Sequence, residues 1–171
     1  HGCSYYAPTE GKPYLEDARP DKESEYQILL GYTGDDNHMP ADLSELSEKG
    51  FDYIALGYEH KASVMQSMHM AYAGSLEPLS VHETGKHGFI LGEINEDSTT
   101  IRFVPFACRE YINIKVRLSS DITEDELEEK LTAAINQYGS DNIFTISLEG
   151  RYQPKEPYDR ARLLALGNVA D

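Results

Sequence analysis

Short hydrophobic runs that end at glycines mark the first half of the chain. The run 51–57 is too short and too rich in β-forming residues for a helix, and we expect a buried strand there. A similar run at 26–30 breaks into a glycine turn at 31–34, and a short helix at 41–49 ends at Gly50. The order strand, helix, strand predicts two neighbouring parallel strands joined by a crossover.

Further short strands are expected beyond this unit. Residues 70–75 are one candidate, and the runs 89–94 and 99–104 predict a hairpin around a polar turn. The polar, proline-containing stretch 7–25 predicts an exposed loop. A βαβ unit followed by several strands indicates a layered α/β sheet with antiparallel additions.

The pattern changes after residue 108, where alternating and helical periods follow one another. Alternating hydrophobic residues predict strands at 111–118 and 144–148. Thr123 and Glu126 form a capping-box pattern that opens a helix, which ends at Gly139. With a last short helix at 158–167, this part is expected to be a small β-α-β-α annex with its own minor core.

Composition limits the possible classes of protein. The chain has 171 residues with 40% apolar residues, enough for one domain or for one domain and a small annex. Its formal charge of −15 argues against a self-sufficient nucleic-acid-binding surface, although acidic residues around metal ions remain compatible with it. There is no apolar stretch of membrane-spanning length and no signal-peptide pattern.

The cysteines and the start of the chain add two expectations. Cys3 and Cys108 give no disulfide framework, which favours a reducing, cytoplasmic setting, and Cys108 is expected to be a small core residue. Because His1 is not an initiator methionine and leads directly into strand-like residues, the chain is expected to be a fragment of a longer protein.

The stretch Phe51–Lys61 carries the most specific candidate chemistry. Its apolar run ends at Gly57, after which Tyr58 and His60, two residues apart, are expected to point to the same side. Sites in α/β proteins gather where strands end, so this stretch is predicted to be one edge of an active site. On the pattern alone, a lone histidine after a strand is more often a polar surface or capping residue than a metal ligand.

Other titratable residues have plainer interpretations. Asp35 and Asp36 are expected to lie in a solvated turn rather than at a metal ion. The acidic start of the 123–139 helix is interpreted as a solvated, dipole-favoured N-terminus. Four scattered histidines are treated as ordinary loop residues: His38, His69, His82 and His87.

Several segments together resemble a known family. Residues 51–61 resemble the metallophosphoesterase nucleases of double-strand-break repair, whose corresponding strand ends in Gly-His-x-His. Residues 28–34 resemble the preceding motif of that family, a strand that ends in a single metal-binding histidine. Segments 71–78 and 83–89 are similar to those after the site, and 103–111 to the exit into the DNA-facing cap. The resemblance covers essentially the whole chain and is closest to the Firmicutes-type DNA repair exonucleases.

This resemblance implies a fold. Residues 1–108 would be the C-terminal half of a calcineurin-like metallophosphoesterase sandwich, and residues 109–171 a small β-α-β-α cap that faces DNA. The cap's basic residues could meet a DNA backbone, but solvation is their default interpretation and the resemblance assigns no DNA contact to any of them. They are Arg109, Lys115, Arg117, Arg151, Lys155, Arg160 and Arg162.

The resemblance also implies two-metal catalysis, with two Mn²⁺ ions that clamp the attacking and leaving oxygens of a phosphodiester. His60 matches the second histidine of Gly-His-x-His and is the expected metal ligand, whereas Tyr58 and Tyr32 stand where the family has histidine ligands. A phenol with a pKa of about 10 is a poor substitute for imidazole. Three interpretations stay open: the second metal is lost, the two tyrosines serve structure, or they are engineered substitutions that disable or stabilise the site.

The implied function follows from these matches and departures. The family's Asp-x-His, bridging Asp and Asn-His motifs have no counterpart here, so the chain is expected to contain no catalytic residue and to be inactive as a fragment of a Mn-dependent DNA repair exonuclease. Implied partners are DNA and an SMC-like ATPase subunit, without a membrane. The alternatives are a non-catalytic scaffold that docks such an ATPase or forms a homodimer, and a calcineurin-like phosphatase.

Overall fold

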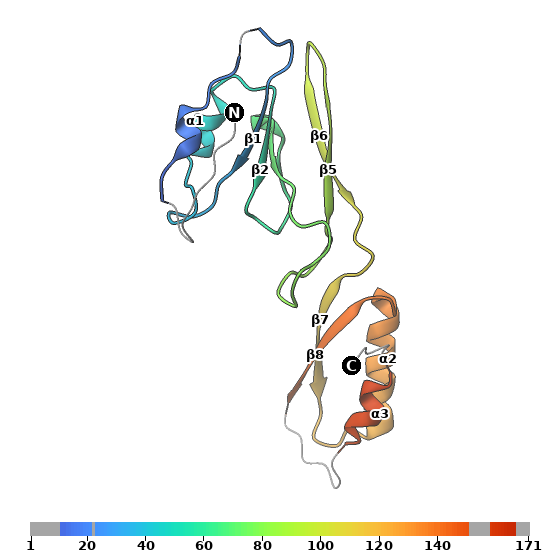
Figure 1. The fold of residues 1–171 in the computed structure, drawn as a ribbon. Helices are drawn as coiled ribbons and strands as arrows, with labels where there is room; N and C mark the ends of the chain where they lie inside the picture. The colour runs from blue at the N-terminus through green and yellow to red at the C-terminus, as the bar shows by residue number, and fades with distance from the viewer. Residues whose placement is uncertain (1–10, 22, 151–157, 167–171) are drawn as a thin grey trace. The chain divides into compact units, whose positions relative to one another are not determined.

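The computed structural model of the chain describes residues 11–21, 23–150 and 158–166. Contacts between residues divide the chain into two units, one of His1–Glu77 with His87–Phe106 and one of Pro78–Lys86 with Ala107–Asp171 (Figure 1). A single division near residue 108 was expected, whereas the second unit also includes Pro78–Lys86. The assignment of the two parts to a metallophosphoesterase domain and a DNA-facing cap stays a prediction.

The first unit contains a four-stranded sheet of mixed direction. Its strands are β1 (Ile28–Tyr32), β2 (Tyr53–Gly57), β3 (Ser63–Met65) and β4 (Met70–Tyr72), in the order β1-β2-β4-β3. β1, β2 and β4 run parallel, and β3 runs antiparallel to β4. The predicted parallel pair flanking a helix is confirmed, with α1 (Leu43–Ser47) between β1 and β2 in the sequence.

The sequence did not reveal two elements next to β4. These are β3 itself and η2 (Gln66–Met68), a short 3₁₀ helix. The side chain of Gln66 donates to the carbonyl of Thr99 at 2.6 Å and accepts from the amide of Ile101 at 2.9 Å. Gln66 thereby ties η2 to the predicted hairpin, which is confirmed as the antiparallel pair β5 (Gly88–Ile94) and β6 (Thr99–Pro105).

The core of the first unit lies on one face of the four-stranded sheet. Its buried residues are Leu15, Leu46, Ile54, Leu56 and Met70. The position of Leu15 corrects one prediction, because residues 7–25 were expected to be an exposed loop and instead contain η1 (Tyr14–Asp17), a 3₁₀ helix that buries this leucine. A Cβ at Gly31 would lie 2.8 Å from Leu15 Cδ1, so the glycine makes room for the leucine on β1.

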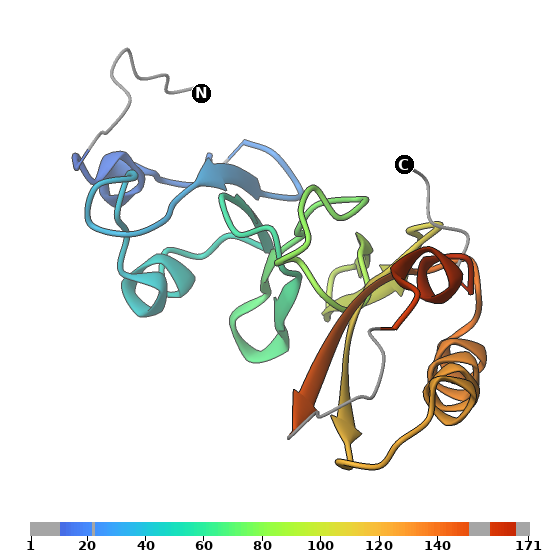
Figure 2. The same ribbon diagram turned by 90° about the horizontal axis from the view of Figure 1, so that it is seen from below.

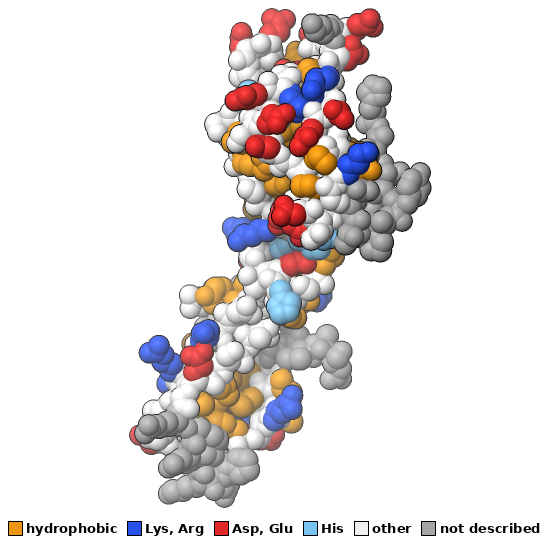
Figure 3. Space-filling view, turned by 90° about the vertical axis from the view of Figure 1, so that its left-hand side faces the viewer, with side chains coloured by type: hydrophobic (Ala, Val, Ile, Leu, Met, Phe, Trp, Pro, Cys, Tyr) orange, Lys and Arg blue, Asp and Glu red, His pale blue; other side chains and the backbone are white. Residues whose placement is uncertain are grey.

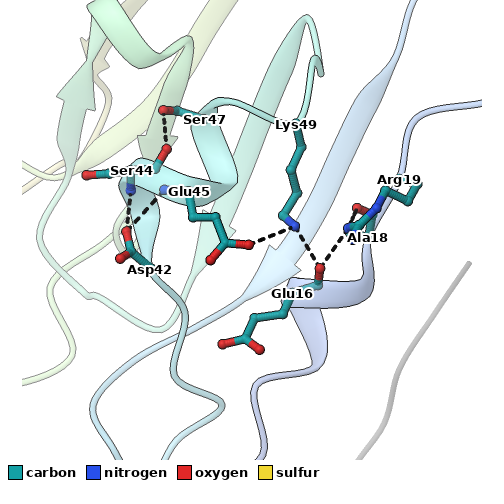
Figure 4. Close-up of polar contacts among 8 residues, drawn as sticks. All are labelled: Glu16, Ala18, Arg19, Asp42, Ser44, Glu45, Ser47 and Lys49. Carbon is teal, nitrogen blue, oxygen red and sulfur yellow. Dashed lines mark hydrogen bonds and ion pairs between the residues drawn. The ribbon is translucent and has the colours of Figure 1, made fainter.

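Polar contacts fasten α1 and η1 to each other (Figure 4). Asp42 caps α1, since its carboxylate accepts from the amides of Ser44 and Glu45. The ammonium of Lys49 donates to the main-chain carbonyl of Glu16 at 2.7 Å and lies 3.5 Å from the Glu45 carboxylate. The contacts of Lys49 thus hold η1, which precedes β1 in the sequence, against α1, which follows it.

The second unit is the predicted β-α-β-α arrangement. It contains β7 (Tyr111–Leu118), α2 (Glu124–Tyr138), β8 (Ile143–Gly150) and α3 (Arg160–Leu164), and β7 pairs with β8 in parallel. Both helices lie on one face of the strand pair (Figures 1 and 2), around a core of Ile114, Val116, Ile122, Leu127 and Leu131. The last helix is shorter than the predicted 158–167, whose final residue lies outside the described residues.

Most acidic side chains at the start of α2 form specific contacts. Thr123 and Glu126 form the predicted capping box, in which the Thr123 hydroxyl accepts from the Glu126 amide at 3.2 Å. The guanidinium of Arg162 pairs with Asp125 at 2.9 Å and also with Glu124 and Glu128. The acidic turn therefore holds α3 in place, in addition to its favourable position at the helix N-terminus.

Two further predictions concerned the burial of Cys108 and the absence of a membrane-spanning segment. Cys108 was expected in the core but is exposed, because it lies in the irregular segment between β6 and β7 and not in an element with a buried face. No helix in the described part of the chain combines the length and apolar character that crossing a bilayer requires.

Candidate functional site

The parallel pairing of β1 and β2 brings two strand ends together. Tyr32, the last residue of β1, lies opposite Gly57, the last residue of β2. The amide of Thr33 donates to the carbonyl of Gly57 at 3.2 Å and continues the ladder by one step. Because parallel strands end at the same edge of a sheet, the segment after β1 and the segment after β2 meet there. The rings of Tyr32 and Tyr58, the two tyrosines that stand where the resembled family has histidine ligands, are in contact here.

Tyr58 stands at the centre of the contacts at this edge. Its ring meets the Tyr32 ring edge-on, with centroids 5.6 Å apart and planes at 87°. On another side it faces the imidazole of His38 at a centroid distance of 5.3 Å. Its hydroxyl donates to Asp35 Oδ2 at 3.1 Å. We call Tyr32, Gly34, Asp35, His38 and Tyr58 the Tyr58 cluster.

The segment after β1 is a closed turn built on Asp35. Asp35 Oδ1 accepts from the Asn37 amide at 2.9 Å and from His38 Nδ1 at 2.6 Å. The main chain adds two bonds, from the amide of His38 to the carbonyl of Asp35 and from the amide of Gly34 to the carbonyl of His38, both 2.8 Å long. An aspartate that accepts from the amide two residues later is typical of an Asx turn. The turn expected at Asp35 is confirmed, whereas the role of His38 in it was missed.

Hydrogen bonds within the cluster shift the pKa values of two of its groups in opposite directions. The bond from His38, followed by that from the Asn37 amide, lowers the pKa of the Asp35 carboxyl. The bond to Asp35, assisted by burial, raises the pKa of the Tyr58 phenol. Since an ordinary tyrosine already titrates near pH 10, the Tyr58 side chain is a neutral hydrogen-bond donor at neutral pH.

His60 follows two residues after Tyr58 and is exposed. Its main-chain carbonyl accepts from the amide of Ser75 at 2.9 Å, which ties the segment after β2 to the segment after β4. A Cβ at Gly74 would lie 2.8 Å from the same carbonyl, so glycine permits this close approach. The assignment of His60 as a metal ligand stays a prediction.

A serine–histidine pair lies between β4 and β5. His87 was interpreted as an ordinary loop residue, but its side chain is buried, and its Nδ1 lies 2.9 Å from Ser75 Oγ and 3.1 Å from the Ser75 carbonyl. The carbonyl of His87 accepts from the Phe106 amide at 2.9 Å. The pair therefore connects the segment after β4 to the start of β5 and, through the His87 carbonyl, to the residue that follows β6. The sequence offered only one sign that His87 is buried, its position directly before Gly88 at the start of a strand, and this sign alone is too weak for a prediction.

The basic residues that were considered for contact with a DNA backbone divide into three groups. Arg162 is engaged by the acidic turn of α2, and Lys115 lies 3.1 Å from Glu149 on the neighbouring strand. Arg109, Arg117 and Arg160 are exposed. Arg151 and Lys155 lie outside the described residues.

The chain was compared with known proteins. No family model matches it. It is 32% identical over 77 residues to the "Uncharacterized metallophosphoesterase YhaO" of Bacillus subtilis (strain 168). The chain is similar to a metallophosphoesterase. The matched segment covers 44% of this chain but only 19% of YhaO, so the chain spans about a fifth of the length of that relative. This similarity supports the metallophosphoesterase superfamily and does not extend to a DNA repair subtype.

Metallophosphoesterases act through divalent metal ions, so we asked whether the residues at the strand ends fit one. Within residues 11–21, 23–150 and 158–166, no three histidine, cysteine, aspartate or glutamate side chains converge as metal ligands would. Asp35 and His38 lie side by side at the strand ends, but they bond to each other, and the third group beside them is the neutral phenol of Tyr58. These residues do not by themselves fit a divalent ion.

Proposed function

We propose that this chain belongs to a metallophosphoesterase-like enzyme and forms one wall of a site that hydrolyses phosphoesters. The observation that carries the proposal is the 32% identity to YhaO over 77 residues. The α/β sheet with its parallel strand ends is consistent with it, because sites in such folds lie where strands end. The divalent ions would be held mainly by residues of a longer polypeptide, and His60 is the one ligand that this chain would supply.

The finer proposal is a Mn²⁺-dependent exonuclease that acts on DNA during repair in the cytoplasm. Its support is the ordered series of motifs from residue 28 to residue 111. On the face shown in Figure 3, acidic side chains predominate over the first unit. With a formal charge of −15, contact with the DNA phosphates would depend on bound metal ions and on other parts of the protein.

The outer face of β1 supports the idea that more polypeptide packs against the first unit. Ile28 and Leu30 point away from the core and are 59% and 81% exposed, and Tyr32 follows them on the same face of the strand. Neighbouring large apolar side chains that are exposed together often mark an interaction surface, whereas single exposed apolar residues are ordinary. In the proposed enzyme this row is covered by the remaining part of the same domain.

The test is hydrolysis by a longer polypeptide that contains this chain, with and without Mn²⁺. Linear double-stranded DNA and a small chromogenic phosphodiester serve as substrates, and a phosphomonoester as the third. We expect Mn²⁺-dependent cleavage of the diesters, with little turnover by the present chain alone. Cleavage of only the monoester would replace the nuclease with a calcineurin-like phosphatase. A longer polypeptide inactive on all three would contradict the proposal.

A non-catalytic scaffold is the second candidate function. The observation that favours it is the Tyr58 cluster, which fills the strand ends with groups bonded to each other. Such a protein would use the exposed row on β1 to dock an SMC-like ATPase or a second copy of itself. Isothermal titration of the longer polypeptide with Mn²⁺ separates the candidates, because tight binding contradicts the scaffold and its absence, together with dimerisation in sedimentation experiments, favours it.

A further inference from the structure

We propose that the side chain of Tyr58 is a built-in structural lock at the end of β2, around which the turn after β1 is shaped, and that its bond to Asp35 opposes metal binding by this carboxylate. The alternative is that Tyr58 merely occupies the place of an absent ligand while its surroundings stay unchanged. Backbone conformation, packing and hydrogen bonding each favour the lock. The inference goes beyond the proposed function and does not depend on it.

The backbone at Tyr58 is the first observation. Its φ is +113°, in the region that bulky residues with a Cβ rarely adopt. Such conformations cost on the order of 1–3 kcal/mol and persist only where the surrounding structure fixes them. A glycine would adopt this φ without cost, yet the chain places a tyrosine there. The contacts of its side chain must therefore offset the backbone cost.

The second observation is the fit between Tyr58 and Gly34. A Cβ added to Gly34 would lie 2.6 Å from three atoms of the Tyr58 ring, Cδ1, Cε1 and Cζ. The ring thus lies flat against the main chain at Gly34, where any other residue would displace it. The turn after β1 carries glycine at the one position that the tyrosine ring covers, so the two segments are fitted to each other.

The third observation is that both oxygens of the Asp35 carboxylate accept hydrogen bonds from the turn and from Tyr58. Its Oδ1 accepts from the Asn37 amide and from His38 Nδ1, and its Oδ2 accepts from the Tyr58 hydroxyl. A metal ion at Oδ2 would compete with the Tyr58 hydroxyl for this oxygen, and one at Oδ1 would compete with His38 and the Asn37 amide. His38 uses its Nδ1 for the same carboxylate, and one face of its ring meets Tyr58. The contacts that hold the lock thus involve Asp35 and His38, the acidic side chain and the imidazole beside Tyr58.

Thermal unfolding of a set of variants tests the lock, with Tyr58→Phe as the first. The change keeps the ring and removes the hydroxyl, so we expect the melting temperature to fall by about 2–4 °C, the shift typical of losing one hydrogen bond in a domain of this size. Tyr138→Phe, at an exposed residue of α2, is the matched control and is expected to change nothing. An unchanged melting temperature in Tyr58→Phe would overturn the hydrogen-bonded lock.

Gly34→Ala tests the packing and distinguishes a lock from a general loss of stability. The added methyl meets the Tyr58 ring, so it should lower the melting temperature when Tyr58 is present and have little effect in the Tyr58→Ala background. Gly57→Ala is the control at the neighbouring strand end, where the nearest atom to the new Cβ would be Tyr32 Cδ2 at 3.4 Å. Equal effects of Gly34→Ala in both backgrounds would contradict the proposal.

Metal addition completes the test. With the lock in place, millimolar Mn²⁺ should leave the melting temperature of this chain the same as in a chelator. A rise with Mn²⁺ that disappears in Asp35→Ala would show that Asp35 binds the ion and would overturn the proposal. These readouts are independent of hydrolysis, so a failure of the proposed enzyme function would leave them unchanged.

Discussion

Tyr58 differs from a histidine at the same position in the kind of bond it forms. A neutral imidazole offers a metal ion a lone pair, whereas a protonated phenol offers a proton to an acceptor. Asp35 is that acceptor, at 3.1 Å from the hydroxyl. A tyrosine at this position can therefore link the end of β2 to the turn after β1 by a hydrogen bond to Asp35, without a bound ion. This difference has a consequence that can be titrated.

The phenol of Tyr58 should titrate above the ordinary range of tyrosine. Its bond to Asp35 raises the pKa, since ionisation would place two negative charges side by side. A group whose pKa is raised in the folded protein stabilises it below the ordinary pKa, and that stabilisation is lost as the pH rises through the raised one. Ultraviolet absorbance of the tyrosinate, compared between the wild type and Tyr58→Phe, isolates this phenol. In Asp35→Ala its pKa should move down towards 10, and no movement would contradict the assigned cause.

At the scale of elements, local sequence patterns predicted the long strands, the hairpin and α2 because each of these repeats a period over several residues. η1 and β3 escaped prediction because each is only three or four residues long, too short to show a period. The burial of Leu15 in η1 also depends on Gly31, a residue distant in sequence. The observed register of β1 and β2, which places Tyr32 opposite Gly57, explains why Tyr32 and Tyr58 meet. The contribution of Asp35 and His38 depends on the shape of a turn, which no period reveals.

The capping box of α2 provides a prediction at this scale. Thr123→Ala removes the hydroxyl that accepts from the Glu126 amide, and loss of such a cap costs about 1 kcal/mol. Urea unfolding of the second unit measures the free energy of unfolding. Thr132→Ala, at an exposed position within the same helix, is the control and should be neutral or slightly stabilising, because alanine is the better helix former. Equal effects of the two changes would remove the cap from the account of α2.

For the whole molecule, the main question is how a chain without a converging set of metal ligands in its described part relates to a metal-dependent superfamily. Its similarity to YhaO covers a fifth of that protein, and the apolar row on β1 offers a surface for more polypeptide. In the proposed enzyme the two units supply a sheet edge and an annex, and most ligands come from elsewhere. The sequence predicted that most ligands come from elsewhere, because the family's Asp-x-His, bridging Asp and Asn-His motifs are missing from it. The structure added that the side chains of the Tyr58 cluster bond to one another at the ends of β1 and β2.

The most direct test is the effect of His60→Ala on Mn²⁺-dependent phosphodiester hydrolysis by the longer polypeptide. Removing a metal ligand should lower kcat/KM by at least 10-fold, and the loss should be smaller at higher Mn²⁺ concentrations. His82→Ala, at an exposed loop position, is the control and should retain full activity. Equal activity of the His60→Ala variant and the wild type, at limiting Mn²⁺, would contradict the claim that this strand end forms a wall of the catalytic site.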